Sequence, residues 1–202
     1  MPRNEGLKDV YNKAYSGNKP YAGAEDSFFT FSTDDITAFL VGQIEFRGKT
    51  VLEVGCGTGE TAAAIARSGA ASVLAVDYAE EAVKTCRTRH ALPNLEFRAA
   101  DYLALADKFD IVVLQEVIEH LDQPSDAIRD LMRLVQDPGG KLVVTCPNFT
   151  NLRGHVWMTL QLLFDVPMSL TDLHFLSPFD LIEIAEKQAL ALEWTTFAHD
   201  RV

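Results

Sequence analysis

The feature of this sequence that most constrains its fold is an apolar run that ends in three alternating glycines. Residues 51–54 read Val-Leu-Glu-Val, and Gly55, Gly57 and Gly59 follow at every second position. The alanine-rich residues 62–66 come next and favour a helix. Glycine allows backbone conformations that other residues avoid and lets the chain approach a ligand closely. We therefore expect a strand, a tight ligand-binding turn and a helix, in that order.

Apolar, strand-like runs alternate with helix-like segments along the rest of the chain. A helix is also expected from Thr33, ahead of the first strand. The expected later strands cover residues 71–77, 95–99, 109–114, 141–146 and 192–198, and the expected later helices cover 80–90, 125–136 and 178–188. This alternation is typical of an α/β fold with a doubly wound, mostly parallel sheet. In such sheets ligands bind at the carboxyl ends of the strands.

Length and composition narrow the class of protein further. The 202 residues, 48% of them hydrophobic, suit a single soluble domain, and we expect one domain over residues 1–202. No apolar run reaches membrane-spanning length and no signal peptide is evident, so a cytoplasmic protein is expected. A net charge of −11 argues against a broad nucleic-acid surface. Cys56, Cys86 and Cys146 form no C-x-x-C pair and are expected to be reduced thiols.

Two kinds of nucleotide suit such a glycine turn, and the acids around it separate them. The nicotinamide fingerprint G-x-G-x-x-G would need a third glycine where this chain has Glu60. That carboxylate, together with Glu53 ahead of the turn, would face the charge of a pyrophosphate. The sequence therefore disfavours a nicotinamide oxidoreductase and favours a ligand that carries an ammonium or sulfonium group.

The turn resembles the first motif of the class I S-adenosylmethionine-dependent methyltransferases, E/D-x-G-x-G-x-G, with Glu53 at the acidic position. Residues 109–121, Phe-Asp-Ile-Val-Val-Leu-Gln-Glu-Val-Ile-Glu-His-Leu, look like the F-D-x-V-x-x-x-E-x-x-E-H stretch of many small-molecule O-methyltransferases, including the ubiquinone-biosynthesis group. The resemblance covers roughly residues 50–147. It implies methyl transfer to a hydroxyl oxygen, and a seven-stranded sheet of which this chain would lack the final strand.

The expected cofactor site follows the strand ends. An acid at the position of Asp77 is the ribose-binding acid of nucleotide-binding α/β folds, and Tyr78 beside it would lie against the adenine. The resemblance implies that Asp101 accepts the adenine amino group and that Gln115 lies near the methionine end. The predicted S-adenosylmethionine-binding residues are Glu53, Gly55, Cys56, Gly57, Gly59, Asp77, Tyr78, Asp101, Tyr102 and Gln115.

Four residues around the second motif are candidates for the acceptor chemistry. Glu116 would lie near both Glu119 and His120 if a helical turn begins there. With His174 as a fourth ligand they form a candidate divalent-metal site, as the resemblance to small-RNA 2′-O-methyltransferases and some catechol-type enzymes implies. Alternatively His120 or His174 is a metal-free general base, or the Glu-His pair only closes a loop and His174 only packs.

Two segments are expected to shape the acceptor side. Residues 1–31 form an N-terminal arm that either packs on the domain or closes as a lid over the cofactor. Residues 148–175 form an insert whose apolar stretch 156–164 is a core helix, a substrate cover, a homodimer face or a membrane-surface contact. The predicted function is methyl transfer to a small-molecule hydroxyl. A metal-dependent RNA 2′-O-methyltransferase and a non-catalytic S-adenosylmethionine-binding protein remain as alternatives.

Overall fold

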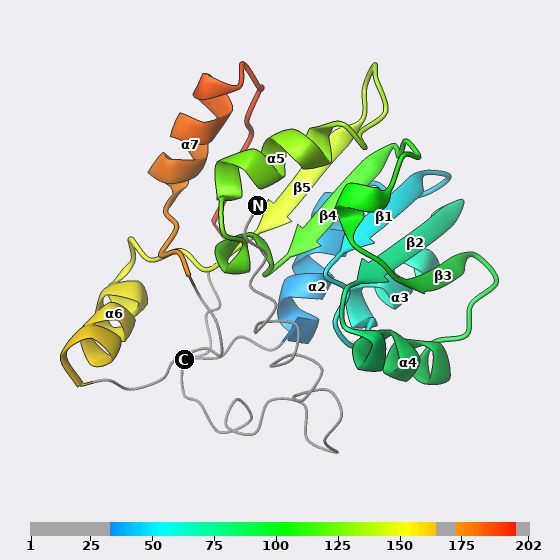
Figure 1. Ribbon diagram of the computed structural model, residues 1–202, viewed down its shortest axis with the longest axis horizontal. Coiled ribbons are helices and arrows are strands. Elements are labelled where there is room, and N and C mark those ends of the chain that lie inside the picture. The colour runs from blue at the N-terminus through cyan, green and yellow to red at the C-terminus, as the bar shows by residue number, and fades with distance from the viewer. Residues whose placement is uncertain (1–32, 165–172, 197–202) are drawn as a thin grey trace.

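A parallel sheet forms the centre of the computed structural model, which describes residues 33–164 and 173–196 (Figure 1). The sheet has five strands in the order β3-β2-β1-β4-β5, and every neighbouring pair is parallel. The strands are β1 (Thr50–Val54), β2 (Ser72–Asp77), β3 (Leu95–Ala99), β4 (Ile111–Gln115) and β5 (Lys141–Thr145). The expected α/β fold with a doubly wound parallel sheet is confirmed.

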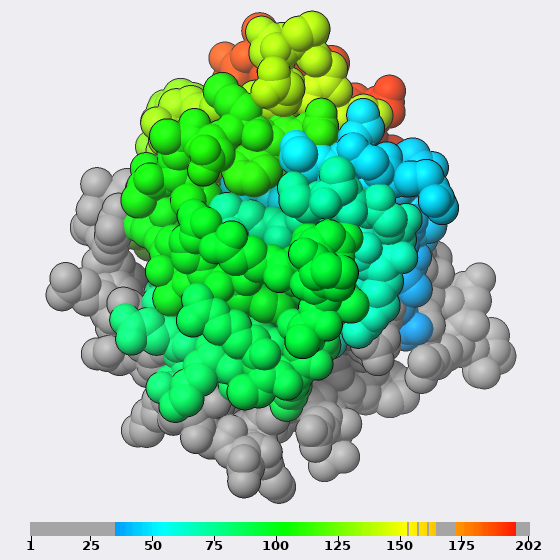
Figure 2. Space-filling view, turned by 90° about the vertical axis from the view of Figure 1, so that its right-hand side faces the viewer, coloured from blue at the N-terminus to red at the C-terminus, as the bar shows by residue number. Residues whose placement is uncertain are grey.

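Helices cover both faces of the sheet, and its three central strands β2, β1 and β4 are mostly buried and nearly all apolar (Figure 1). Helices α2 (Thr33–Gln43), α3 (Glu60–Arg67) and α4 (Glu80–Arg89) pack on one face, and α5 (Pro124–Met132) packs on the other. The short helices η1 (Tyr102–Ala104) and η2 (Ile118–His120) follow β3 and β4. Figure 2 looks at the β3 side, where the green residues after β2 and the blue and cyan residues of the N-terminal half form one continuous face.

The strand register brings the predicted site residues to one edge. Leu52 pairs with Leu74 of β2 and with Val112 of β4. From this line each strand continues for a few residues to Val54, Asp77 or Gln115. Because parallel strands end at the same edge, the glycine turn after β1 and the acids after its neighbours lie together at the carboxyl edge of the sheet.

The C-terminal part of the described chain differs from the expectation. Helix α7 (Pro178–Lys187) forms as predicted, with Ser177 and Asp180 in a reciprocal capping box. The sixth strand predicted for 192–198 is wrong as far as the structure describes it, because residues 192–196 form no strand. The apolar side chains of Leu192 and Trp194 are 41% and 55% exposed, so they do not pack on the sheet as a sixth strand would.

The apolar stretch 156–164 lies in helix α6 (Leu152–Phe164), which projects from the body of the protein (Figure 1). A core helix, one of the expectations for it, is wrong: Leu162 and Leu163 are 71% and 73% exposed. The start of α6 packs closely on the chain before it, since a side chain on Gly154 would collide with the backbone of Phe149. Among the described residues no helix is both long and apolar enough to cross a membrane. The N-terminal arm 1–31 and residues 165–172 of the insert lie outside the described residues.

Candidate cofactor and acceptor site

The glycine turn joins β1 to α3 as predicted. All three glycines have positive φ angles, 76° at Gly55, 51° at Gly57 and 87° at Gly59. The turn is fastened to the neighbouring strand, because the backbone N–H groups of Gly55 and Cys56 both donate to the carbonyl of Val76, at 2.8 and 3.1 Å. L-residues with side chains rarely adopt these angles, so the backbone path itself requires glycine.

Two of the glycines also make room for other side chains of the protein. A Cβ on Gly55 would lie 2.5 Å from a methyl group of Val117, which follows β4. A Cβ on Gly59 would lie 2.9 Å from the ring of Phe97 in β3. Gly59 is also the N-cap residue of α3. Its requirement for glycine is therefore explained by packing and helix geometry alone.

Two buried carboxylates, Glu53 and Asp77, flank this turn. Asp77 accepts the backbone N–H of Gly57 at 3.0 Å with one oxygen and that of Ala79 at 2.8 Å with the other. Glu53 is 2% exposed, and its Oε2 accepts no hydrogen bond within the described part of the chain. Burial, and then the charge of Asp77, raises the pKa of Glu53 to about 8. Burial also raises the pKa of Asp77, although its backbone hydrogen bonds oppose this.

These two acids fit a ligand that carries positive charge at the turn. Each carboxylate oxygen has two acceptor positions, so Asp77 keeps capacity for further donors such as ribose hydroxyls after binding Gly57 and Ala79. An acceptor buried at the position of Glu53 Oε2 costs free energy until a donor or a cation reaches it. The donor set of the turn is therefore consistent with S-adenosylmethionine.

Helix α4 holds the turn from the side opposite to β4. The thiol of Cys86 donates to the carbonyl of Gly57 at 3.1 Å, and His90 Nε2 donates to that of Thr58 at 3.2 Å. Sequence reasoning gave His90 no partner, because nothing in the spacing links it to the turn. The Cys56 thiol is buried in the core, where its hydrogen bond with Cys86 and then desolvation raise its pKa. Only the backbone of Cys56 is therefore placed to meet a ligand.

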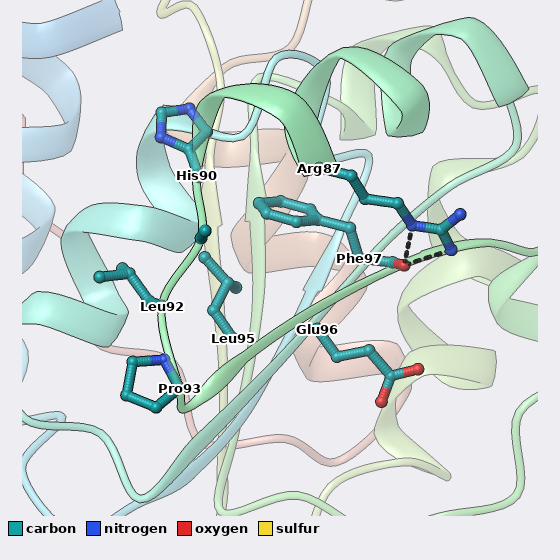
Figure 3. Close-up of a pocket in the computed structure, with 8 residues that line it drawn as sticks. Arg87, His90, Leu92, Pro93, Leu95, Glu96 and Phe97 are labelled. Carbon is teal, nitrogen blue, oxygen red and sulfur yellow. Dashed lines mark hydrogen bonds between the residues drawn. The ribbon is translucent and has the colours of Figure 1, made fainter.

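A cavity lies near these contacts, between the end of α4 and the start of β3 (Figure 3). It measures about 570 Å³ and is lined by residues 87, 90–93 and 95–97. The Arg87 guanidinium turns away from His90 and donates twice to the carbonyl of Phe97, at 2.7 and 3.1 Å (Figure 3). No predicted cofactor residue lines this cavity.

The predicted adenine contacts follow β2 and β3. The backbone N–H of Ala100 donates to the carbonyl of Asp77 at 3.0 Å, which joins the two strand ends. Asp101 is half-buried and caps η1, accepting the N–H of Leu103 at 2.9 Å. Tyr78 is 36% exposed beside Asp77. Asp101, Tyr102 and Tyr78 thus occupy neighbouring loops at the edge where the adenine is expected.

Gln115, predicted to lie near the methionine end, makes its contacts within the protein. Its Oε1 lies 3.1 Å from the hydroxyl of Thr61, and its Nε2 lies 3.1 Å from the hydroxyl of Thr37. The two hydroxyls are 2.7 Å apart. The side chain of Gln115 is therefore engaged with helices α2 and α3. Sequence reasoning singled out neither threonine.

The loop after β4 begins with a strained residue. Glu116 has a φ angle of 53°, a left-handed conformation that is uncommon for a residue with a side chain. Thr145 at the end of β5 holds it there. Its carbonyl accepts the Glu116 N–H at 3.1 Å, and its hydroxyl donates to the Glu116 carboxylate at 3.0 Å. Strained residues of this kind are common at functional sites.

The structure brings His174 to this loop, as the sequence predicted. The backbone N–H groups of Leu173 and His174 donate to the carbonyl of Glu119 at 3.0 and 3.2 Å. His174 Nε2 lies 2.9 Å from the carbonyl of Leu121, so that nitrogen carries a proton. Glu119 is 1% exposed, and its Oε1 lies 3.9 Å from Nε2 of His120.

The four predicted metal ligands are near one another but form no cluster. Within residues 33–164 and 173–196, no group of three or more His, Cys, Asp and Glu side chains could hold a metal ion. The Glu116 carboxylate accepts a hydrogen bond from Thr145, and His174 Nε2 donates one to the Leu121 carbonyl. Both side chains are therefore engaged within the protein. The donor set does not fit a metal, and the metal interpretation receives no support.

Comparison with known proteins identifies the family. A family model described as "Methyltransferase domain" matches residues 52–144. The ubiquinone biosynthesis O-methyltransferase of Coxiella burnetii is 31% identical over 171 residues, which are 80% of this chain and 71% of that protein. The chain belongs to the class I S-adenosylmethionine-dependent methyltransferases. The same-named protein of Neisseria meningitidis serogroup C is 37% identical over 108 residues, 50% of this chain and 45% of that protein.

Solved structures agree on the fold. Magnesium protoporphyrin IX methyltransferase from Synechocystis, with bound S-adenosylhomocysteine, has a TM-score of 0.71 at 20% identity and covers 98% of this chain and 94% of its own. The N-methyltransferase NodS of Bradyrhizobium japonicum, in complex with S-adenosylhomocysteine, has a TM-score of 0.56 at 20% identity, covering 68% and 71%. The alignments span between about half and 71% of the curated relatives' length.

Proposed function

We propose that this protein transfers the methyl group of S-adenosylmethionine to a hydroxyl oxygen of a small molecule. The observation that carries the proposal is the glycine turn itself, which has two buried acids beside it and Asp77 bonded to the N–H of Gly57. The relatives named ubiquinone biosynthesis O-methyltransferases support an oxygen acceptor on a small molecule.

The donor site we propose follows the predicted residues, with one change. The turn residues Gly55 and Gly57 present backbone to the methionine part, Asp77 accepts the ribose hydroxyls, and Asp101 with Tyr78 faces the adenine. Gln115 is left out of this site, because its side chain bonds to Thr37 and Thr61. When bound, S-adenosylmethionine supplies a methyl group activated by its positive sulfur. The contribution of the protein is to hold donor and acceptor in line and to exclude water.

A hydroxyl acceptor must lose its proton as the oxygen–methyl bond forms and the sulfur–methyl bond breaks. We propose His120 as the general base that takes this proton. Its side chain is 19% exposed, so an acceptor can reach it, and the buried Glu119 carboxylate lies 3.9 Å away. His174 is less suited, because its Nε2 already carries a proton for the Leu121 carbonyl.

The test is a mass-shift screen in which purified protein and isotope-labelled S-adenosylmethionine are incubated with phenolic and catecholic metabolites. A labelled methyl on an acceptor oxygen supports the proposal. Methylation of the 3′ end of an RNA, with dependence on added metal, would support the RNA alternative instead. Donor binding by calorimetry without transfer to any acceptor would indicate a non-catalytic binding protein.

We also propose that the exposed helix α6 contacts either the acceptor or a second copy of the chain. These are the substrate-cover and homodimer-face expectations for residues 156–164. The outward-facing Leu162, Leu163 and Phe164 support an apolar contact. Light scattering of the wild type and of Leu162→Ser/Leu163→Ser separates the two. A dimer that dissociates in the variant supports a homodimer face, and an unchanged mass with a raised KM for acceptor supports an acceptor contact.

The cytoplasmic location and the lid role of residues 1–31 stay predictions.

A further inference from the structure

Three buried side chains from distant parts of the chain form a closed ring of hydrogen bonds: Thr37 in α2, Thr61 in α3 and Gln115 at the end of β4. They are 6%, 4% and 9% exposed. One arrangement of protons satisfies the three shorter contacts, which close the ring, and leaves the 3.3 Å approach of the Thr37 hydroxyl to Gln115 Oε1 without a proton. Gln115 Nε2 donates to the Thr37 hydroxyl at 3.1 Å, Thr37 donates to the Thr61 hydroxyl at 2.7 Å, and Thr61 donates to Gln115 Oε1 at 3.1 Å.

A ring of this kind is sensitive to the loss of any one member. Each hydroxyl is both a donor to one neighbour and an acceptor from the other, so removing it leaves two buried polar groups unsatisfied. The surroundings of the ring offer little compensation. Between α2 and α3 lies a cavity of about 350 Å³ that reaches Thr37 and Glu60.

The ring members reach the glycine turn from both sides. Thr61 is the second residue of α3, directly after the turn ends at Gly59 and Glu60. Gln115 is two residues before Val117, whose methyl group occupies the space above Gly55. The ring therefore ties the end of β4 to the start of α3, where the glycine turn ends.

The ring also places α2 at the cofactor edge. Thr37 lies in the first half of α2 and contacts the last residue of β4, so the start of this helix is at the carboxyl edge of the sheet. A helix that only packed apolar side chains on the sheet would need no buried hydroxyl at the position of Thr37. Leu40, one turn later, supplies the apolar contact at 3% exposure.

We propose that Thr37, Thr61 and Gln115 are positioning residues that hold the glycine turn at the width needed by the methyl donor. The inference rests on the proposed function and replaces the predicted contact of Gln115 with the cofactor. Thr37 touches no cofactor in this arrangement, yet donor affinity depends on its hydroxyl. His120, the proposed base, is not a member of the ring.

The test compares Thr37→Val, which keeps the shape but removes the hydroxyl, with Thr37→Ser, which keeps the hydroxyl. Thr37→Val is expected to raise the Kd for S-adenosylmethionine and the donor KM roughly tenfold, with kcat at saturating donor unchanged. Thr37→Ser is expected to restore wild-type affinity. Thr88→Val is the matched control, because that exposed hydroxyl bonds only to carbonyls of its own helix.

Thr61→Val opens the same ring from α3 and is the second variant, which also covers a failure of Thr37→Val to fold. Both single variants and the double variant should show the same increase in Kd, because a ring that is already open loses little more. A lower melting temperature with unchanged Kd, an additive double variant or failure of serine to restore affinity would overturn the ring proposal. If the wild type itself binds no S-adenosylmethionine, the proposed function fails instead.

Discussion

The carboxylates of Glu53 and Asp77 lie on adjacent strands, and the charge of Asp77 helps to raise the pKa of Glu53 to about 8. The larger cause is burial, since Glu53 is 2% exposed. Two acids placed together without a cation oppose folding when both are ionised. This arrangement stores part of the free energy that a positively charged ligand recovers on binding.

The stability of the ligand-free protein should therefore fall as pH rises. Between pH 4.5, the ordinary pKa of the Glu53 side chain, and about 8, the folded protein keeps a proton that the unfolded chain releases. The free energy of unfolding then decreases by at most about 1.4 kcal/mol per pH unit from this group. Urea unfolding of the wild type and of Glu53→Gln across this range measures the effect. The variant should show a flatter slope, with a residual slope of the same sign from Asp77; equal slopes would contradict the burial of a proton at Glu53.

Asp77→Asn should weaken donor binding on the order of ten- to a hundredfold, because charge-assisted hydrogen bonds to ribose are each worth about 1.5–3 kcal/mol. Calorimetric titration with S-adenosylhomocysteine measures it. Asp110→Asn is a suitable control, since that carboxylate also accepts two bonds, from the N–H and hydroxyl of Thr50, but at the opposite edge of the sheet. An equal loss in both variants would point to general destabilisation.

Gly59→Ala should destabilise the fold by roughly 1–3 kcal/mol, through a left-handed φ angle and a Cβ placed 2.9 Å from the ring of Phe97. Gly139→Ala separates the two causes, because Gly139 has a similar φ of 91° with nothing near its Cβ. Thermal unfolding should therefore show a smaller loss for Gly139→Ala. If the two variants unfold alike, the contact with Phe97 contributes nothing.

His120→Ala should lower kcat by about 10²- to 10⁴-fold, the range that general-base catalysis contributes, while the Kd for the donor stays the same. Asp110→Asn, at the opposite edge of the sheet, serves as the control. Single-turnover rates with labelled donor, measured once an acceptor is known, distinguish chemistry from binding. Full activity in His120→Ala would show that the acceptor proton leaves by another route.

The sheet, its helices and the glycine turn could be predicted because local signals specify them. Alternating glycines after a β-branched run, and an acid at or near the end of each of the first four strands, leave few other folds. The contacts that bind distant segments together carry no such signal. Thr37 and Thr61 are ordinary helix residues in the sequence, and only the packing of α2 on α3 brings their hydroxyls to Gln115.

The candidate acceptor side was predicted less well for related reasons. Helical spacing suggested that Glu116, Glu119 and His120 share one face, but the left-handed φ of Glu116 breaks the helix before it starts. The approach of His174 was expected from the sequence, yet its Nε2 is used by the Leu121 carbonyl. The apolar composition of 156–164 predicted a helix without revealing that its leucines face outward.

The close approach of Val117 to Gly55 couples the glycine turn to the loop after β4. Val117 belongs to the loop that carries His120, and its methyl group lies over the turn proposed to receive the donor. Neither segment can shift without disturbing the other. We therefore expect binding of the donor at the turn to affect the position of the loop that carries His120.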